Sequence, residues 1–113
     1  MIVRALVAAS TKPMILAILR HGENYGYQII QSVREASGGQ LDWSEPMLYP
    51  VLHRMERDGL IRSQWRTSDR GRLRKYFRLT ELGLAELDRE KSQWLTVHAA
   101  LSRFWDPLPG IRG

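Results

Sequence analysis

The chain has 113 residues and a mass of 13.1 kDa, which is enough for one domain and too little for two. It contains no cysteine, so disulfides, thiolate nucleophiles and sulfur-ligated metal sites are excluded, and we expect the protein in a reducing, cytoplasmic compartment. Its net charge of +5 and its pI of about 10.1 favour an anionic partner.

The first third of the chain predicts a helix over 12–21. Its apolar side chains recur at helical spacing, Ser10 or Thr11 can cap it, and Pro13 suits its first turn. The apolar residues 1–9 either fray or form a separate helix, whose apolar face would need a second surface such as another subunit. This opening run is too short to span a bilayer, a signal peptide is its less favoured interpretation, and no membrane partner is expected.

Two further helices follow in the prediction. After a turn at 22–24, the second helix ends at the two glycines 38–39, because glycine readily adopts the left-handed conformation of a helix C-terminus. Ser44 caps a third helix, which Gly59 ends. Pro50 lies inside this helix, where we expect a local distortion. The apolar positions of the third helix follow i, i+3, i+4, i+7 spacing: Leu48, Val51, Leu52 and Met55.

Beyond the third helix the pattern changes to a period of two. Apolar and polar side chains alternate over 61–66 and over 74–79, with a turn at 68–71 between them, which predicts a two-stranded hairpin. Residues 62–78 hold seven basic side chains and one acidic side chain, a formal charge of +6 that leaves −1 for the rest of the chain. The hairpin therefore has a basic tip.

A last helix is capped by Thr80 and extends to Trp105, before Asp106-Pro107 stops it. Its roughly 25 residues reach about 37 Å at 1.5 Å per residue, longer than a domain of this size, so the helix should protrude. A stripe of apolar and large side chains along it calls for a partner helix, and we expect a homodimer. The stripe has members three or four residues apart: Leu84, Leu87, Lys91, Trp94, His98, Leu101 and Trp105.

The order of these elements predicts a mainly α (α+β) fold. It comprises a winged helix-turn-helix DNA-binding domain with a two-stranded β-wing over 1–80, a long C-terminal dimerisation helix over 81–106 and a tail over 107–113. Double-stranded DNA is the expected partner, because a helix fits the major groove and arginines on a tip reach phosphates or the minor groove. Taken alone, the third helix is equally well explained as a solvated face with a basic edge. The expected DNA-contacting residues are Tyr27, Ser44, Met47, Tyr49, Pro50, His53, Arg54, Arg70, Arg72, Arg74 and Lys75.

Three blocks occur in order along the chain: residues 25–29 (YGYQI), 48–61 (LYPVLHRMERDGLI) and 71–83 (GRLRKYFRLTELG). Together they cover most of 14–83 and resemble the PadR family of bacterial transcriptional regulators. The chain length and the single terminal helix resemble the short PadR subgroup. This resemblance implies a dimeric winged-helix repressor that binds a palindromic operator and, in some members, releases it when a small molecule binds.

The chain is also similar, over almost its whole length, to the multidrug-sensing branch of that subgroup, including residues 22–25 (GENY) and 35–39 (EASGG). Sensors of that branch place a tryptophan of the last helix at the dimer centre, where two copies sandwich planar aromatic drugs, and Trp94 falls at that position. An indole offers stacking area to aromatic and cationic ligands. A planar aromatic effector at Trp94 is one hypothesis, and packing of Trp94 in the dimer core is the other.

Two positions depart from the family pattern. Pro46-Met47 stand where the family usually has a small residue and threonine, which removes a hydroxyl from the groove-facing turn. Leu73 stands where the wing often has proline or a basic residue, which leaves Arg72 and Arg74 to supply the charge.

Other classes of function are disfavoured. His21, His53 and His98 lie on separate predicted elements, and no Ser/His/Asp order, phosphate-binding loop or paired-carboxylate site is present, so we expect neither catalysis nor a cofactor. His98 and its symmetry mate could hold a metal, but a packed histidine is the favoured interpretation and no metal is expected. A protein that only binds other proteins through the last helix would leave the basic hairpin unexplained.

Overall fold

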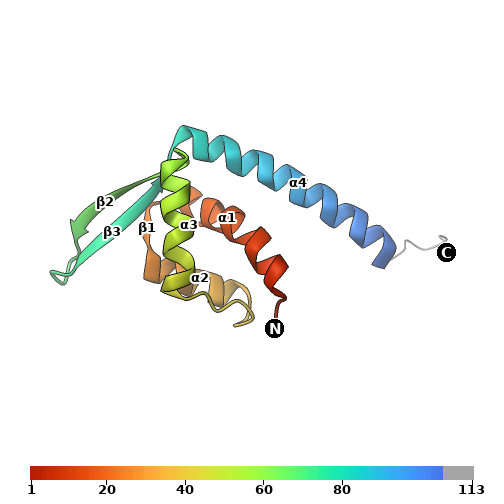
Figure 1. Cartoon of the computed structure of the whole chain (residues 1–113), viewed down its shortest axis with the longest axis horizontal. Coiled ribbons are helices and arrows are strands. Elements are labelled where there is room, and N and C mark those ends of the chain that lie inside the picture. The colour runs from red at the N-terminus through yellow and green to blue at the C-terminus, as the bar shows by residue number, and fades with distance from the viewer. Residues whose placement is uncertain (106–113) are drawn as a thin grey trace.

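The computed structural model describes residues 1–105, and this part of the chain forms four helices and a three-stranded antiparallel sheet (Figure 1). Their order confirms the predicted α+β winged helix-turn-helix fold. The expected helix stop at Asp106-Pro107 and the tail at 107–113 lie outside the described residues. The elements are α1 (Arg4–Arg20), β1 (Asn24–Tyr25), α2 (Gly26–Ala36), α3 (Glu45–Arg57), β2 (Ile61–Thr67), β3 (Leu73–Leu79) and α4 (Glu81–Trp105).

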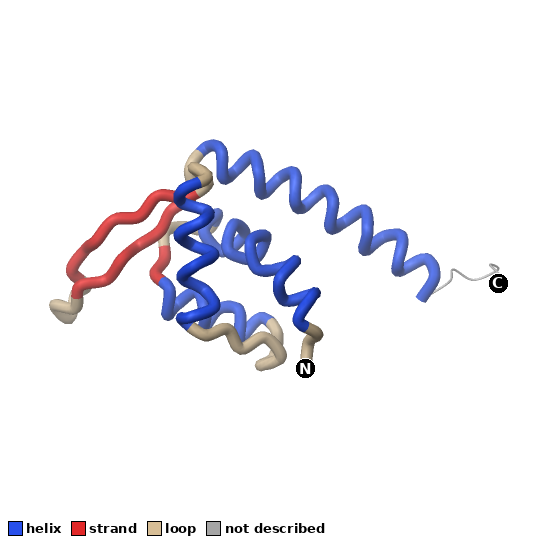
Figure 2. The backbone as a smooth tube through the Cα atoms, in the orientation of Figure 1, coloured by secondary structure: helices blue, strands red, loops and turns tan. Residues whose placement is uncertain are grey.

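In the backbone view of Figure 2, α1, α2 and α3 lie together beside the base of the hairpin. Side chains of these helices and of the sheet form the hydrophobic core, to which α4 contributes Leu87, near its start. Burial of one such aliphatic or aromatic side chain stabilises the fold by about 1.5–3 kcal/mol. None of the helices in the described part is long and apolar enough to cross a membrane. The main contributors to the core are Ile15, Leu16 and Leu19 of α1, Ile29, Ile30 and Val33 of α2, Leu48, Leu52 and Met55 of α3, and Ile61 and Phe77 of the sheet.

The predicted hairpin is confirmed, with its register. Ile61 lies opposite Leu79 and Trp65 lies opposite Lys75 in the antiparallel pairing of β2 with β3. Phe77 is fully buried on the face that packs against the helices, as the alternation of apolar and polar residues requires. The far ends of the two strands extend beyond the helices (Figure 1), so the hairpin tip is open to a partner.

One strand was not predicted. Asn24, expected in a turn, and Tyr25, expected in the second helix, form β1 and pair with Phe77 and Tyr76 of β3, so the sheet has the order β1-β3-β2. Two residues are too few to show a period, and their pairing depends on β3, some 50 residues away, which is why the sequence pattern did not indicate a strand here.

The expected start of the first helix was wrong. α1 runs without a break from Arg4 to Arg20, so residues 1–9 do not form a separate helix. Ser10 and Thr11 cap nothing: each hydroxyl donates to a carbonyl one turn earlier in the same helix, at 2.6 Å. Pro13 lies inside the helix, where it removes one backbone donor. Packing of the buried residues on both sides of Pro13 outweighs this local loss.

α3 has the predicted cap and runs through Pro50 without a break. The backbone N–H of Met47 donates to the Ser44 hydroxyl at 3.3 Å, which confirms Ser44 as the N-cap. The helix continues through Pro50 without interruption, and the local distortion expected there stays a prediction. The carbonyl that loses its donor belongs to Pro46, an exposed residue whose carbonyl water can reach.

The start of α4 is fixed against the turn that follows α3. The Thr80 hydroxyl accepts from the backbone N–H of Gly83 at 3.0 Å, which confirms Thr80 as the cap, and donates to the carbonyl of Gly59 at 2.6 Å. Gly83 is buried, and a Cβ at this position would overlap the carbonyl oxygen of Leu60. Only glycine allows the helix to approach this closely.

From this start α4 extends well past the rest of the chain (Figure 1). The Cα radius of gyration of 16.7 Å exceeds the value of about 13 Å expected for a globular domain of this size, and the longest extent is 61 Å. The prediction that the last helix protrudes is therefore confirmed.

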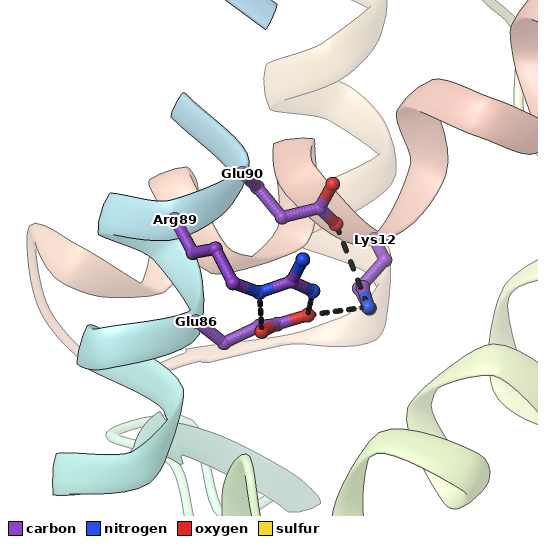
Figure 3. A network of polar contacts seen from close by, with 4 residues as sticks. All are labelled: Lys12, Glu86, Arg89 and Glu90. Carbon is purple, nitrogen blue, oxygen red and sulfur yellow. Dashed lines mark hydrogen bonds and ion pairs between the residues drawn. The ribbon is translucent and has the colours of Figure 1, made fainter. Parts of the chain in front are cut away.

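An ion-pair network links α4 to α1 (Figure 3). Lys12 of α1 donates to Glu86 of α4 at 2.7 Å and lies 3.5 Å from Glu90, one turn further along α4. The Arg89 guanidinium holds Glu86 with two hydrogen bonds of 2.9 and 2.7 Å. Arg89 and then Lys12 lower the pKa of Glu86 to about 2, so this carboxylate is ionised throughout the neutral range.

The close approach at Gly83 can be tested by a single substitution. Gly83→Ala is expected to lower the free energy of unfolding by about 1–3 kcal/mol, because the added Cβ overlaps backbone in a dense site. Ala85→Ser, at an exposed position in the same helical turn, should stay within about 0.5 kcal/mol of the wild type. Urea unfolding at one protein concentration measures both, and equal midpoints for Gly83→Ala and the wild type would contradict the close approach.

Candidate nucleic-acid interface

A groove of about 650 Å³ separates the face of α3 from the hairpin. Its volume is bounded by β1 and the N-terminal end of α2, by one flank of α3 from Glu45 to His53, and by residues 65 and 72–75 of the hairpin. Six of the residues expected to contact DNA line it together: Tyr27, Tyr49, His53, Arg72, Arg74 and Lys75. Three elements separated in sequence thus converge on one surface.

The start of α2 lies close to Tyr49 of α3. A Cβ at Gly26 would lie 2.5 Å from the Tyr49 hydroxyl, so a larger residue at this position would require the tyrosine ring to shift. Burial and then the Glu45 carboxylate raise the pKa of Tyr49, so its phenol remains a hydrogen-bond donor. Tyr27, one residue after Gly26, is 56% exposed and points into the groove. Of the residues 25–27 (YGY), Tyr25 thus belongs to a strand, Gly26 packs against Tyr49, and Tyr27 lines the groove.

Two basic residues of the hairpin are held by the protein itself on the outer face of the sheet. Arg66 forms an ion pair with Glu23 and stacks on the ring of Tyr76, with its guanidinium carbon 4.2 Å from the ring centroid. Arg74 stacks on Tyr25 at 4.3 Å in the same way. Such cation–π contacts are worth about 0.5–2 kcal/mol each. They fix the hairpin to the loop after α1, so Arg74 is less free than the sequence indicated.

The tip of the hairpin keeps its charge available. Arg70 and Arg72 are exposed, and no ion pair or cation–π contact holds either of them within the described residues. The turn is closed by two hydrogen bonds between Ser68 and Arg72, the backbone pair at 2.7 Å and the Ser68 hydroxyl with the Arg72 N–H at 3.2 Å. Gly71 has a φ of 78°, which only glycine adopts readily.

The remaining expected contact residues lie elsewhere on α3. Pro50 is exposed on its solvent face, and the Ser44 hydroxyl is engaged by the helix cap. Met47 packs partly against the core and, with Arg54, lines a second groove between α3 and α1. The structure does not bring Met47 and Arg54 to the groove beside the hairpin, because Tyr49 and His53 occupy the flank of the helix that faces it.

Some groove residues were missed by the sequence analysis. Trp65 and Leu73 project from the hairpin into the groove and are 60% and 61% exposed. Glu23, whose carboxylate holds Arg66, gave no signal either, because the two residues are 43 positions apart and their ion pair depends on the pairing of β1 with β3. The alternation of side chains along the two strands does place Trp65 and Leu73 on the inner face, so these two groove residues could have been predicted from the sequence.

A third groove, which is apolar and has a volume of about 440 Å³, lies between α1 and α4. Trp94, the expected ligand-binding residue, is 37% exposed at its edge. Leu87 also lines this groove. It was expected at the dimer interface, but it belongs to the core of its own chain and packs within the protomer. The other residues around the groove are Ser10, Pro13, Met14, Ala17, Arg20, His21, Lys91 and Leu95.

A helix-turn-helix joined to a basic hairpin, with one groove shared by both, defines a winged-helix protein of the class that regulates transcription. Comparison with known proteins places it more closely. The transcriptional regulator PadR-like family matches residues 15–89, and the chain belongs to that family. The multidrug-sensing branch stays a prediction.

Individual relatives agree. A transcriptional regulator of Mycobacterium tuberculosis is 37% identical over 76 residues, which cover 67% of this chain and 70% of the relative. The crystal structure of a PadR family transcription regulator from Clostridium difficile is 32% identical, has a TM-score of 0.76, and the match covers 85% of this chain and 98% of that one. A PadR-like regulator from Bacillus cereus is 27% identical with a TM-score of 0.81 and coverages of 90% and 97%.

Proposed function

We propose that the protein is a homodimeric PadR-type repressor that binds a palindromic operator through the groove between α3 and the hairpin. The observation that carries this proposal is the convergence of Tyr27, Tyr49 and His53 with the basic hairpin on that one groove. Its wall is a helix of the size that enters the major groove, and its rim is cationic.

The chemistry of the groove divides between its two sides. On α3, His53 is exposed and the Tyr49 phenol is a donor, so both can contact phosphates or base edges. On the hairpin, Arg70 and Arg72 reach furthest from the body and suit phosphates or the narrow minor groove. Trp65 and Leu73 cover the floor between them with apolar surface, which suits sugar and thymine methyl groups.

Dimerisation is supported by a change along one face of α4. Gly83 and Leu87 on this face are buried against the body of the protomer. The same face continues seven residues beyond Leu87 at Trp94, and then at Val97 and Leu101, all exposed in the single chain. Apolar surface of this extent needs a cover, and a second copy of α4 is the cover we propose.

A two-fold dimer accounts for a palindromic operator. The two bodies would present identical α3 helices related by the dimer axis, so each would contact the same half-site in opposite orientation. Half-sites of such regulators lie about one helical turn of DNA, or a multiple of it, apart. Occupation of such a site at a promoter would exclude polymerase, which is the repressor activity.

DNA binding can be tested on sites selected from a random-sequence library. Affinity should fall steeply with salt, since each neutralised phosphate releases counterions, and Arg72→Ala should reduce the slope of log K against log salt by about 1 for each phosphate that the variant leaves unneutralised. Arg103→Ala removes the same charge from the exposed far end of α4 and should leave the slope unchanged. Selection that enriches no sequence, or equal slopes for wild type and Arg72→Ala, would contradict the assignment.

The oligomeric state can be tested by sedimentation equilibrium. The wild type is expected at twice 13.1 kDa, and Leu101→Glu at the monomer mass, because a buried carboxylate without a partner is costly. Ala99→Glu adds the same charge on the opposite face of α4 and should leave the dimer intact. A dimer that survives Leu101→Glu would place the interface elsewhere.

The second candidate function is a sensor in which a planar aromatic molecule, bound at the dimer interface, releases the DNA. The groove between α1 and α4 favours it, because its lining is mainly apolar and Trp94 stands at its edge with an accessible indole. A stacked aromatic pair is worth about 0.5–1.5 kcal/mol beyond area burial, so such a ligand would draw affinity from Trp94 directly.

A planar cationic dye serves as the probe. It is expected to quench tryptophan fluorescence and to displace the selected DNA in a mobility-shift titration, and Trp94→Ala should abolish both effects. Trp65→Ala is the control for quenching, since Trp65 lies in the groove between α3 and the hairpin. Quenching that persists in Trp94→Ala would assign Trp94 to packing alone and leave the repressor proposal standing.

A further inference from the structure

α4 is attached to the body of the protomer along a short length. Within its described residues only Gly83 and Leu87 are buried, both in the first two turns. Beyond Leu87, the ion pair between Lys12 and Glu90 is the one salt bridge from the described part of α4 to another element. The direction of the helix relative to the body therefore depends on a few interactions near its start.

Lys12 is placed to fix that direction. Its ammonium group lies between two carboxylates on successive turns of α4, at 2.7 Å from Glu86 and 3.5 Å from Glu90 (Figure 3). Both carboxylate side chains are largely covered, with 16% and 15% of their surface exposed. Glu86 is also oriented by two hydrogen bonds from Arg89. A pair that is shielded and preoriented holds its geometry better than an exposed surface pair.

A small change of this angle is magnified at the far end of the helix. From Gly83 to Trp105 the helix rises by about 33 Å, so a rotation of about 5° at its start moves its end by about 3 Å. One base-pair step of DNA is about 3.4 Å. In a dimer joined through the far half of α4, both protomers would contribute such a displacement to the separation of the two α3 helices.

We propose that Lys12 is a positioning residue: by bridging Glu86 and Glu90 it sets the angle between α4 and the DNA-binding body, and with it the half-site spacing that the dimer accepts. This inference rests on the proposed dimeric, DNA-binding function. Lys12 itself binds no DNA and acts only through the direction of α4.

The first test measures the geometry directly. Because the chain has no cysteine, Glu35→Cys on the exposed end of α2 gives one spin label per protomer, and pulsed dipolar spectroscopy reports the distance between the two bodies. Lys12→Met in this background should shift the mean distance by about 3 Å or more, or widen its distribution. Lys12→Arg should restore the parent distribution, because it restores the charge.

Arg4→Met is the matched control. It removes one positive charge from α1, as Lys12→Met does, but Arg4 is exposed and forms no ion pair with α4 within the described residues, so the distance should stay as in the parent. An unchanged distribution in a dimeric Lys12→Met protein would overturn the proposal. If the parent protein gives no distance between labels, the dimer itself is contradicted. Failure of the dimer can therefore be distinguished from failure of the proposal for Lys12.

The second test measures DNA. The wild type should bind its selected operator more tightly than versions with one base pair added or removed between the half-sites, by about tenfold or more, the scale of a mismatch. Lys12→Met should keep its affinity for a single half-site and lose most of that discrimination, and Lys12→Arg should recover it. If Lys12→Met still discriminates between the spacings, the proposal is contradicted. A folding defect would be recognised separately, because it would weaken binding to a single half-site.

Discussion

The organisation of this protein depends on one apolar face of α4 that needs two different covers. Near Gly83 and Leu87 the face is buried by the body of its own chain, and a Cβ at Gly83 would overlap the backbone of the turn after α3. Further along, the same face carries exposed Trp94, Val97 and Leu101. The first part attaches α4 to the body of the protomer, and the second part is the surface that we assign to a second copy.

The basic hairpin divides its charges between structure and binding. Arg66 forms an ion pair with Glu23, directly before β1, and Arg74 stacks on Tyr25 of β1, so their charge holds the hairpin to this segment. Arg70 and Arg72, at the tip, carry no such restraint among the described residues. A hairpin of two strands alone is marginally stable. The stacked arginines and the third strand give this one a fixed orientation beside α3, and the tip is left for the DNA contact that we propose.

Local patterns were enough to predict most elements of the fold, because their signals lie within a few residues. The Ser44 cap, the Thr80 cap and the alternation of the hairpin were confirmed in this way. What failed depended on partners distant in sequence. Packing carries α1 through Pro13, pairing with β3 turns residues 24–25 into a strand, and the fold sets which flank of α3 faces the hairpin. The groove residues on separate elements could be proposed singly, and only the folded chain brings them together.

The most direct test of a dimer built on α4 is a hydroxyl-radical footprint of the wild-type protein at saturation on its selected DNA. Two protein bodies held by one α4 pair should protect two segments related by two-fold symmetry, with centres one helical turn of about 10–10.5 base pairs, or a multiple of it, apart. A single protected segment, or two segments without that symmetry, would contradict a dimer built on the uncovered face of α4.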